Sequence, residues 1–246
     1  MTRPAHADPF PPAFALVTHA GRCIAVRLPP AEPFDRAGVL AALHPEERAL
    51  AEGFRGARLI AFAGGRVAAR RAGGAEIPTL RGPDGAPVRA GGRVSISHSR
   101  RLAVALVADG TGLHPGVDVE PLAPDPADHL LAERILAPEE RDDASLPLVA
   151  RLSLKEAAFK ALHPLLGPVA FRRIVVLAGR NGGLRLEVPA AVRLAAALRY
   201  VEDHVLGVVA VSPEAPRRAA SSAPAASPTG IQKVSHIQSV GVRTRS

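Results

Sequence analysis

The stretch HPGVDVEPL, residues 114–122, places two carboxylates in a valine-rich segment that reads as a β-strand. Because strand side chains alternate between two faces, we expect Asp118 and Glu120 on one face and Val117 and Val119 on the other. Two like charges this close repel, and each raises the pKa of the other. A solvated outer face is the commoner reason for such a pair. The alternative is a site for Mg²⁺, whose preference for oxygen ligands turns the repulsion into binding.

A second informative stretch is LSLKEAAFK, residues 152–160. In a helix, Glu156 and Lys160 stand one turn apart on one face, with Lys155 about 100° away around the axis. An isolated pair of this kind is more often a solvent-facing ion pair. Beside Asp118 and Glu120, however, Glu156 would complete an oxygen-rich Mg²⁺ site, and Lys160 could contact a phosphate held by the same metal.

Hydrophobic periodicity and turn residues predict the order of elements along the chain. Strands are expected over 14–28, 93–99, 101–109, 116–121 and 204–212, helices over 45–73, 128–141 and 148–166, and a hairpin over 172–188 with Asn181-Gly182-Gly183 at its turn. Strands and helices thus recur in a similar order without a sequence repeat. We therefore predict an α+β fold of two similar, pseudo-twofold halves with the active site in the cleft between them.

The predicted halves are an N-terminal one over 1–115, with the basic binding residues, and a C-terminal one over 116–212, with the metal and catalytic residues. Residues 213–246 are rich in Ala, Ser and Pro and lack apolar periodicity, so a disordered tail is expected there. The tail carries five basic residues against one glutamate, which is four of the net charge of +8. The remaining body is only mildly basic and shows no basic run interleaved with aromatics, so nucleic acid is not expected as a partner.

Composition narrows the class of protein further. Hydrophobic residues make up 47% and charged residues 22% of the 246, as in ordinary globular proteins. No apolar run approaches the length of a membrane span, and the N-terminal residues lack a signal-peptide core, so stable membrane insertion is not expected. The single cysteine, Cys23, excludes an internal disulfide and is consistent with a reducing cytoplasm. We expect a cytoplasmic monomer.

The order GVDVE followed by KEAAFK resembles the signature of the Sfp-type 4′-phosphopantetheinyl transferases, most closely the enterobactin-synthase branch. ISHS at 96–99 is similar to the S-[IL]-[ST]-H block of that family, and TLRGPDGAPV at 79–88 to its basic-Gly-x-x-Gly-x-P turn. Arg58 and Arg66 match paired basic residues of the preceding helix. Each motif alone is weak, and four in order over residues 44–212 make a specific signal.

Two positions depart from the family pattern. Leu152 stands where the family usually has an aromatic residue, which puts some packing in doubt. Ala86 stands where many members have lysine, and Arg81 could supply the missing phosphate contact.

The resemblance implies transfer of 4′-phosphopantetheine from coenzyme A, the co-substrate, to a serine of an apo acyl or peptidyl carrier protein, with release of adenosine 3′,5′-bisphosphate. It implies Asp118, Glu120 and Glu156 as Mg²⁺ ligands, and Glu156 and Lys160 as catalytic residues. The residues it implies for coenzyme A are Arg58, Arg66, Arg81, Ser97, His98 and Lys160. Guanidinium groups suit that coenzyme because they bind phosphate bidentately.

Two other functions remain open at this point. The carboxylates also fit a Mg²⁺-dependent phosphate-ester hydrolase. A degenerate site would instead fit a non-catalytic protein, either one that binds coenzyme A or one with a regulatory role. The arginines and the ISHS stretch favour a coenzyme with a nucleotide tail. The sequence carries no readable code for the carrier, whether of fatty-acid, polyketide or peptide synthesis, including siderophore synthesis.

Overall fold

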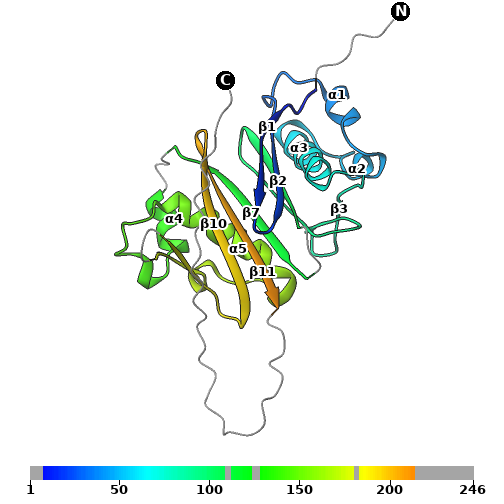
Figure 1. The fold of residues 1–246 in the computed structure, drawn as a ribbon. Helices are drawn as coiled ribbons and strands as arrows, with labels where there is room; N and C mark the ends of the chain where they lie inside the picture. Colours follow the sequence, from blue (N-terminus) through cyan, green and yellow to red (C-terminus); the bar gives the residue numbers. More distant parts are fainter. Residues whose placement is uncertain (1–7, 109–111, 124–127, 180–182, 214–246) are drawn as a thin grey trace, which may run out of the picture.

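A computed structural model describes residues 8–108, 112–123, 128–179 and 183–213 (Figure 1). The elements up to residue 108 are β1 (Pro12–Thr18), β2 (Gly21–Arg27), α1 (Arg36–Ala41), α2 (Pro45–Leu50), α3 (Gly56–Gly73), β3 (Leu80–Arg81), β4 (Pro87–Val88), β5 (Val94–His98) and β6 (Leu102–Ala108). Those that follow are β7 (His114–Pro121), α4 (Asp128–Ile135), α5 (Leu148–Leu166), β8 (Val175–Ala178), β9 (Leu184–Glu187), β10 (Val192–Val201) and β11 (His204–Pro213), with short 3₁₀ turns at Pro138–Glu140 and Phe171–Arg173. This mixture of helices and sheets is the predicted α+β class.

Two antiparallel sheets form the centre of the molecule. One has the strand order β1-β2-β6-β5 and the other β10-β11-β7, and two small pairs, β3-β4 and β8-β9, lie outside them. The two larger sheets meet along β5 and β7, where the Ser95 hydroxyl accepts a hydrogen bond from the Val117 backbone N–H at 3.0 Å. This junction joins elements that are predicted to belong to different halves.

The helices and sheets stack in four layers (Figure 1). Helix α3 packs on one face of the β1-β2-β6-β5 sheet around Leu59, Ala63 and Val67. Helix α5 packs on the outer face of the other sheet through Leu154 and Leu162. The inner faces of the two sheets share a core of buried residues, namely Cys23, Ala25, Val104, Leu106, Val117, Val119, Leu206 and Val208. Apolar burial on this scale between the sheets holds the two parts of the chain together.

A buried glutamate anchors α3. Glu47, in the stretch HPEER at the start of α2, is fully buried. Its carboxylate accepts hydrogen bonds from the backbone N–H groups of His44 at 3.0 Å and Thr79 at 2.8 Å, and pairs with the Arg70 guanidinium of α3 at 2.5 Å. Because a buried carboxylate is costly unless paired and hydrogen-bonded, these partners explain why the residue is tolerated there.

The same arrangement recurs before α5. Glu140, in the stretch APEER, is 1% exposed and accepts hydrogen bonds from the backbone N–H groups of Ala137 at 2.6 Å and Val176 at 2.8 Å. It pairs with the Lys155 ammonium of α5 at 2.7 Å. Each long helix is therefore tied by the buried glutamate of a Pro-Glu-Glu-Arg turn to a small strand pair, α3 to the residue before β3 and α5 to β8. The turn is a short repeat that periodicity alone did not reveal.

Several elements differ from the prediction. The helix expected over 45–73 is two helices, α2 and α3, because the chain breaks before Gly56, which has a φ of 47°. Strand β10 was missed, since its alanine-rich sequence VRLAAALRYV shows little strand periodicity. The expected boundary at residues 115 and 116 lies inside β7 and stays a prediction. The hairpin turn at 181–182 and the tail beyond Pro213 lie outside the described residues.

Candidate active site

Asp118 is the centre of the candidate site. It lies in β7, and only 3% of its surface is exposed. Its Oδ1 accepts hydrogen bonds from the Ser97 hydroxyl of β5 and from the Lys160 ammonium of α5, each at 2.7 Å. The other oxygen, Oδ2, is buried and has no hydrogen-bond partner among the residues that the structure describes. One carboxylate thus joins three elements and keeps one oxygen unpaired.

Two glycines allow α5 to approach β7 and β11 closely. A Cβ atom at Gly116 would lie 1.8 Å from the Ala157 carbonyl oxygen, and one at Gly207 would lie 2.6 Å from the Ser153 carbonyl oxygen. Ser153 fixes the helix there, since its hydroxyl donates to the Asp118 carbonyl at 3.1 Å and accepts from the Gly207 N–H at 2.9 Å. This close packing of α5 on β7 and β11 turns Glu156 and Lys160 toward the carboxylates of β7.

The three carboxylates act on one another electrostatically. Burial raises the pKa of Glu120 to about 7, with the charges of Asp118 and Glu156 adding to the rise and Lys160 opposing it. Burial also raises the pKa of Glu156, against the attraction of Lys160 and with Asp118 adding to the rise. The expected repulsion between Asp118 and Glu120 is therefore present in the fold, and Glu156 takes part in it.

The donor chemistry of this group suits Mg²⁺, a cation that prefers oxygen ligands. Asp118 Oδ2 is a free acceptor, and a divalent cation would relieve the repulsion that raises the pKa of Glu120 and Glu156. Across the described ranges, no three His, Cys, Asp or Glu side chains stand close enough together to hold a metal ion. Mg²⁺ binding by Asp118, Glu120 and Glu156 stays a prediction.

Ser97 and His98 end strand β5 beside the carboxylates. The Ser97 hydroxyl donates to Asp118, so in this structure it orients a carboxylate. Burial lowers the pKa of His98, Lys160 lowers it further, and Asp118 opposes the change. His98 is therefore neutral at pH 7 and close enough to Lys160 and Asp118 to sense their charges. Contact of either residue with the coenzyme stays a prediction.

The three predicted arginines all lie in the N-terminal part of the chain, Arg58 and Arg66 on α3 and Arg81 on β3. The Arg66 guanidinium lies 3.8 Å from the centre of the Phe62 ring, and burial lowers the pKa of Arg66 to about 10, with Glu47 opposing the fall and Arg81 adding to it. Arg58 lies 4.1 Å from the centre of the Phe54 ring. Arg81 is exposed. The charges that act on Arg66 are thus those of its own half of the chain, whereas the carboxylates interact with Lys160.

A cavity of about 640 Å³ opens between the two parts of the chain. One wall comes from the β3–β4 turn and the start of β5, and the other from the start of β7 and the end of α5, including Lys160. The Asp84 carboxylate of the turn lies 3.6 Å from the His163 imidazole of α5 and so joins the walls. The lining residues are Asp84, Ala86, Pro87, Val88, Arg89, Gly92, Arg93, Val94, Ser95, Ile96, His114, Pro115, Phe159, Lys160, His163 and Pro164.

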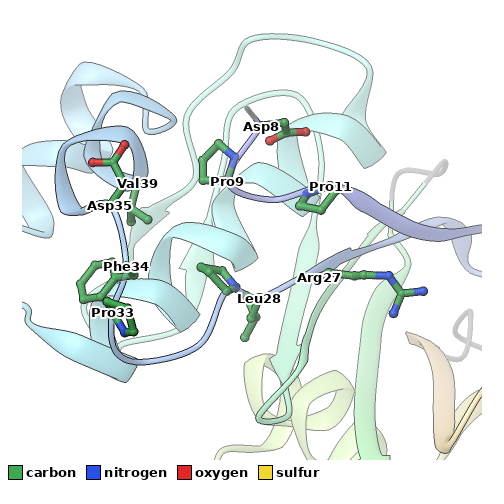
Figure 2. Close-up of a pocket in the computed structure, with 10 residues that line it drawn as sticks. Asp8, Pro9, Pro11, Arg27, Leu28, Pro33, Phe34, Asp35 and Val39 are labelled. Carbon is green, nitrogen blue, oxygen red and sulfur yellow. The ribbon is translucent and has the colours of Figure 1, made fainter. Parts of the chain in front are cut away.

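A second cavity, of about 540 Å³, is formed by residues 8–39 alone (Figure 2). Its wall is rich in proline and includes Phe34 and Leu28. Two of its charged residues form ion pairs, since Asp8 contacts Arg71 at 2.7 Å and Arg27 contacts Glu202 of the β10–β11 turn at 2.5 Å. The predicted site residues do not line this cavity, so it is not part of the candidate site.

Ser153, Gly207, Arg93 and His114 were not singled out from the sequence. Ser153 lies within LSLKEAAFK, and its small side chain next to the predicted catalytic face was the available signal. Gly207 interrupts the otherwise apolar strand HVLGVVAVS, where an isolated glycine indicates close backbone approach. The proximity of Arg93 and His114 depends on the packing of β5 against β7, and periodicity gives no sign of it.

No family model matches this chain, and no curated protein matches it. Solved structures give a partial likeness. The apo-ACPS structure of Chronobacterium ammoiniagenes is 23% identical, with a TM-score of 0.34, over 42% of this chain and 98% of that one. The holo-(acyl-carrier-protein) synthase of Bacillus anthracis in complex with CoA (3′,5′-ADP) is 21% identical, with a TM-score of 0.35, over 41% and 96%. The acyl carrier protein synthase of Mycobacterium tuberculosis is 24% identical, with a TM-score of 0.33, over 42% and 100%.

A likeness at TM-scores this low establishes neither a shared activity nor shared site residues. It also does not single out the Sfp-type branch or the pseudo-twofold relation predicted from the motifs. Within the described ranges, no helix has both the length and the apolar character needed to cross a membrane.

Proposed function

We propose that this chain is a 4′-phosphopantetheinyl transferase of the Sfp type, which moves phosphopantetheine from coenzyme A to a serine of an apo acyl or peptidyl carrier protein. The observation that carries the proposal is the junction at Asp118. There the GVDVE strand, the ISHS strand and the KEAAFK helix meet through two hydrogen bonds of 2.7 Å, beside Glu120 and Glu156. The three motifs were identified separately, and the fold brings them to one point.

The cavity beside this junction suits an elongated anionic ligand. Arg89, Arg93 and Lys160 line it against the single carboxylate of Asp84, so its charge favours phosphate groups. Both parts of the chain supply its walls, which supports a monomer as the active form. We propose that the nucleotide end of coenzyme A occupies this cavity, with the diphosphate at Lys160.

The chemistry follows from the charges of the site. The serine oxygen of the carrier attacks the β-phosphorus of the diphosphate, the bond from that phosphorus to the bridging oxygen breaks, and adenosine 3′,5′-bisphosphate leaves with the electron pair. Glu156 takes the serine proton, a role that its raised pKa favours because a stronger base accepts a proton more readily near neutral pH. Lys160 stabilises the negative charge on the leaving phosphate.

Asp118 and Ser97 position these groups. Asp118 holds the Lys160 ammonium, and Ser97 fixes the orientation of the Asp118 carboxylate. Mg²⁺, if bound by Asp118, Glu120 and Glu156, would supply further neutralisation of the diphosphate charge.

Mass spectrometry of an apo carrier protein tests the proposal. The carrier is incubated with this chain, coenzyme A and Mg²⁺, and the expected result is a mass increase equal to one phosphopantetheine arm on a single serine. Cleavage of coenzyme A without carrier modification would indicate a hydrolase. Binding of coenzyme A with neither product would indicate a non-catalytic protein. A panel of carriers from fatty-acid, polyketide and peptide synthesis identifies the partner, and an arm on none of them contradicts the proposal.

A further inference from the structure

Arg93 is a cation of the cavity that has no carboxylate partner among the described residues. Lys160 pairs with Asp118 at 2.7 Å, and the Arg89 guanidinium donates to the Ala69 carbonyl at 2.9 Å while it lies against Gly73. Arg93 is exposed at the start of β5, and no carboxylate in the described ranges lies within ion-pair distance of it. An unpaired guanidinium in a ligand cavity is available to an anion.

His114 holds this guanidinium in place. The ring is 7% exposed at the start of β7, and its Nε2 contacts the Arg93 Nη1. Burial lowers the pKa of His114, and the charge of Arg93 lowers it further, so the ring is neutral and Nε2 can accept the hydrogen bond. One N–H of Arg93 is used in this way. Its other N–H groups make no hydrogen bond to any residue that the structure describes, and they form a planar fork, the geometry that matches a phosphate group.

The family turn that precedes β5 lacks its usual cation. Ala86 lines the cavity at the position where lysine is common in the family it resembles. Arg81 does not replace that lysine in the cavity, because its guanidinium lies against Gly85, 3.3–3.4 Å from the point where a Cβ atom would stand. The β3–β4 turn therefore presents no positive charge to the cavity, and the cations on the same wall are Arg89 and Arg93.

We infer that Arg93, fixed by His114, binds a second phosphate of the ligand, the 3′-phosphate of coenzyme A. This inference rests on the proposed function. Lys160, which pairs with Asp118, marks the part of the cavity that takes the diphosphate. Arg93 precedes Ser97 by four residues, which is about 13 Å along an extended chain. The 3′-phosphate and the diphosphate are attached to different carbons of the ribose, so a second cation can bind the 3′-phosphate while Lys160 contacts the diphosphate.

Calorimetric titration of the full chain tests the inference with two ligands, coenzyme A and 3′-dephospho-coenzyme A, at constant Mg²⁺. Arg93→Ala is expected to weaken binding of coenzyme A by about 10- to 100-fold, as for loss of a hydrogen bond to a charged group. Binding of the dephosphorylated ligand should change by less than about 2-fold. Arg100→Ala is the matched control, because Arg100 is exposed in the β5–β6 turn and its loss removes the same charge outside the cavity.

Equal losses for the two ligands, or no loss for either, would overturn the assignment. A selective loss in Arg66→Ala but not in Arg93→Ala would overturn it as well. If Arg93→Ala fails to fold, Arg93→Lys provides the same comparison, with a smaller selective loss because the charge stays and the fork is lost. If the wild-type chain transfers phosphopantetheine, but Arg93→Ala still prefers coenzyme A over 3′-dephospho-coenzyme A as strongly as wild type does, this inference alone is refuted. A wild-type chain that neither binds coenzyme A nor transfers refutes the proposed function together with it.

Discussion

Replacing the two lysines of KEAAFK should have different effects, with Lys155 affecting stability and Lys160 affecting the transfer rate. Lys155 is fully buried, and its ammonium contacts Glu140 at 2.7 Å, the Phe171 carbonyl at 3.0 Å and the Ile174 carbonyl. Lys155→Met keeps a chain of similar length but leaves the Glu140 carboxylate buried without its main cation. Removing one partner of a buried ion pair costs about 3–5 kcal/mol of the free energy of unfolding.

The lower end of that range applies here. The Arg151 guanidinium lies 3.9 Å from Glu140 Oε1 and offsets part of the lost charge. A loss of about 3 kcal/mol lowers the melting temperature of a chain of this size by about 6–12 °C. Calorimetry and urea denaturation measure the change, and phosphopantetheine transfer is assayed at 15 °C, well below either melting temperature. We expect the transfer rate of Lys155→Met to stay within about 3-fold of wild type, because Lys155 does not reach the carboxylate site.

Lys160→Met is the comparison, and it should lower the transfer rate measured at 15 °C by about 100-fold or more. The double variant Lys155→Met/Glu140→Gln should be more stable than Lys155→Met alone, because the unpaired charge is gone. If Lys155→Met lost less than about 1 kcal/mol, the anchoring role assigned to Glu140 would be refuted. A large fall in the transfer rate of Lys155→Met at unchanged stability would instead assign Lys155 to the active site.

Three further predictions follow. Glu156→Gln should lower kcat/KM for transfer by about 100-fold or more, and full recovery of the rate on raising Mg²⁺ would contradict its role as the base. Asp143 has its pKa lowered by hydrogen bonds from the Ser145 side chain and backbone and by Arg151. Its stabilising effect is therefore present above its unfolded pKa of about 3.9 and is lost as the pH falls through the lower folded value. The difference in unfolding free energy between wild type and Asp143→Asn should be full at pH 7 and shrink below about pH 4, and a difference that stays constant with pH would refute the assignment. Burial raises the pKa of Cys23 to about 12, so the thiol should not react with Ellman's reagent at pH 8 until urea unfolds the chain.

Much of the candidate site could be predicted from the sequence because its residues lie in short motifs with fixed periods. The alternation of GVDVE set the shared face of Asp118 and Glu120, and the helical spacing of KEAAFK set that of Glu156 and Lys160. Contacts between residues of the two predicted halves were harder to predict. The hydrogen bond from the Ser97 hydroxyl to Asp118 was not predicted, because strand β5 lies beside β7 in a way that no local pattern encodes.

The elements that periodicity missed have identifiable causes. Strand β10 is rich in alanine, which has a weak preference for strands and leaves its alternation hard to see. The first Pro-Glu-Glu-Arg turn is an ordinary helix start in the sequence, since an acidic first turn is common there. The second lies at the end of the helix expected over 128–141, whereas α4 ends at Ile135. The glutamates of the two turns are buried only because Arg70 and Lys155 approach from elements 23 and 15 residues away.

The close packing of α5 against Gly116 and Gly207 has a consequence for how relatives of this chain will diverge. Glu120 and Glu156 repel each other and Asp118, so a copy released from selection for catalysis can replace these two glutamates and lose little stability. Gly116 and Gly207 have no such freedom, because any side chain there meets helix backbone within 2.6 Å. A drifted copy that keeps both glycines and Ser153 while losing these two glutamates should therefore be a folded, inactive protein. A copy that loses the glycines first is no longer expected to fold, and this order of loss separates a recruited binding protein from a decaying gene.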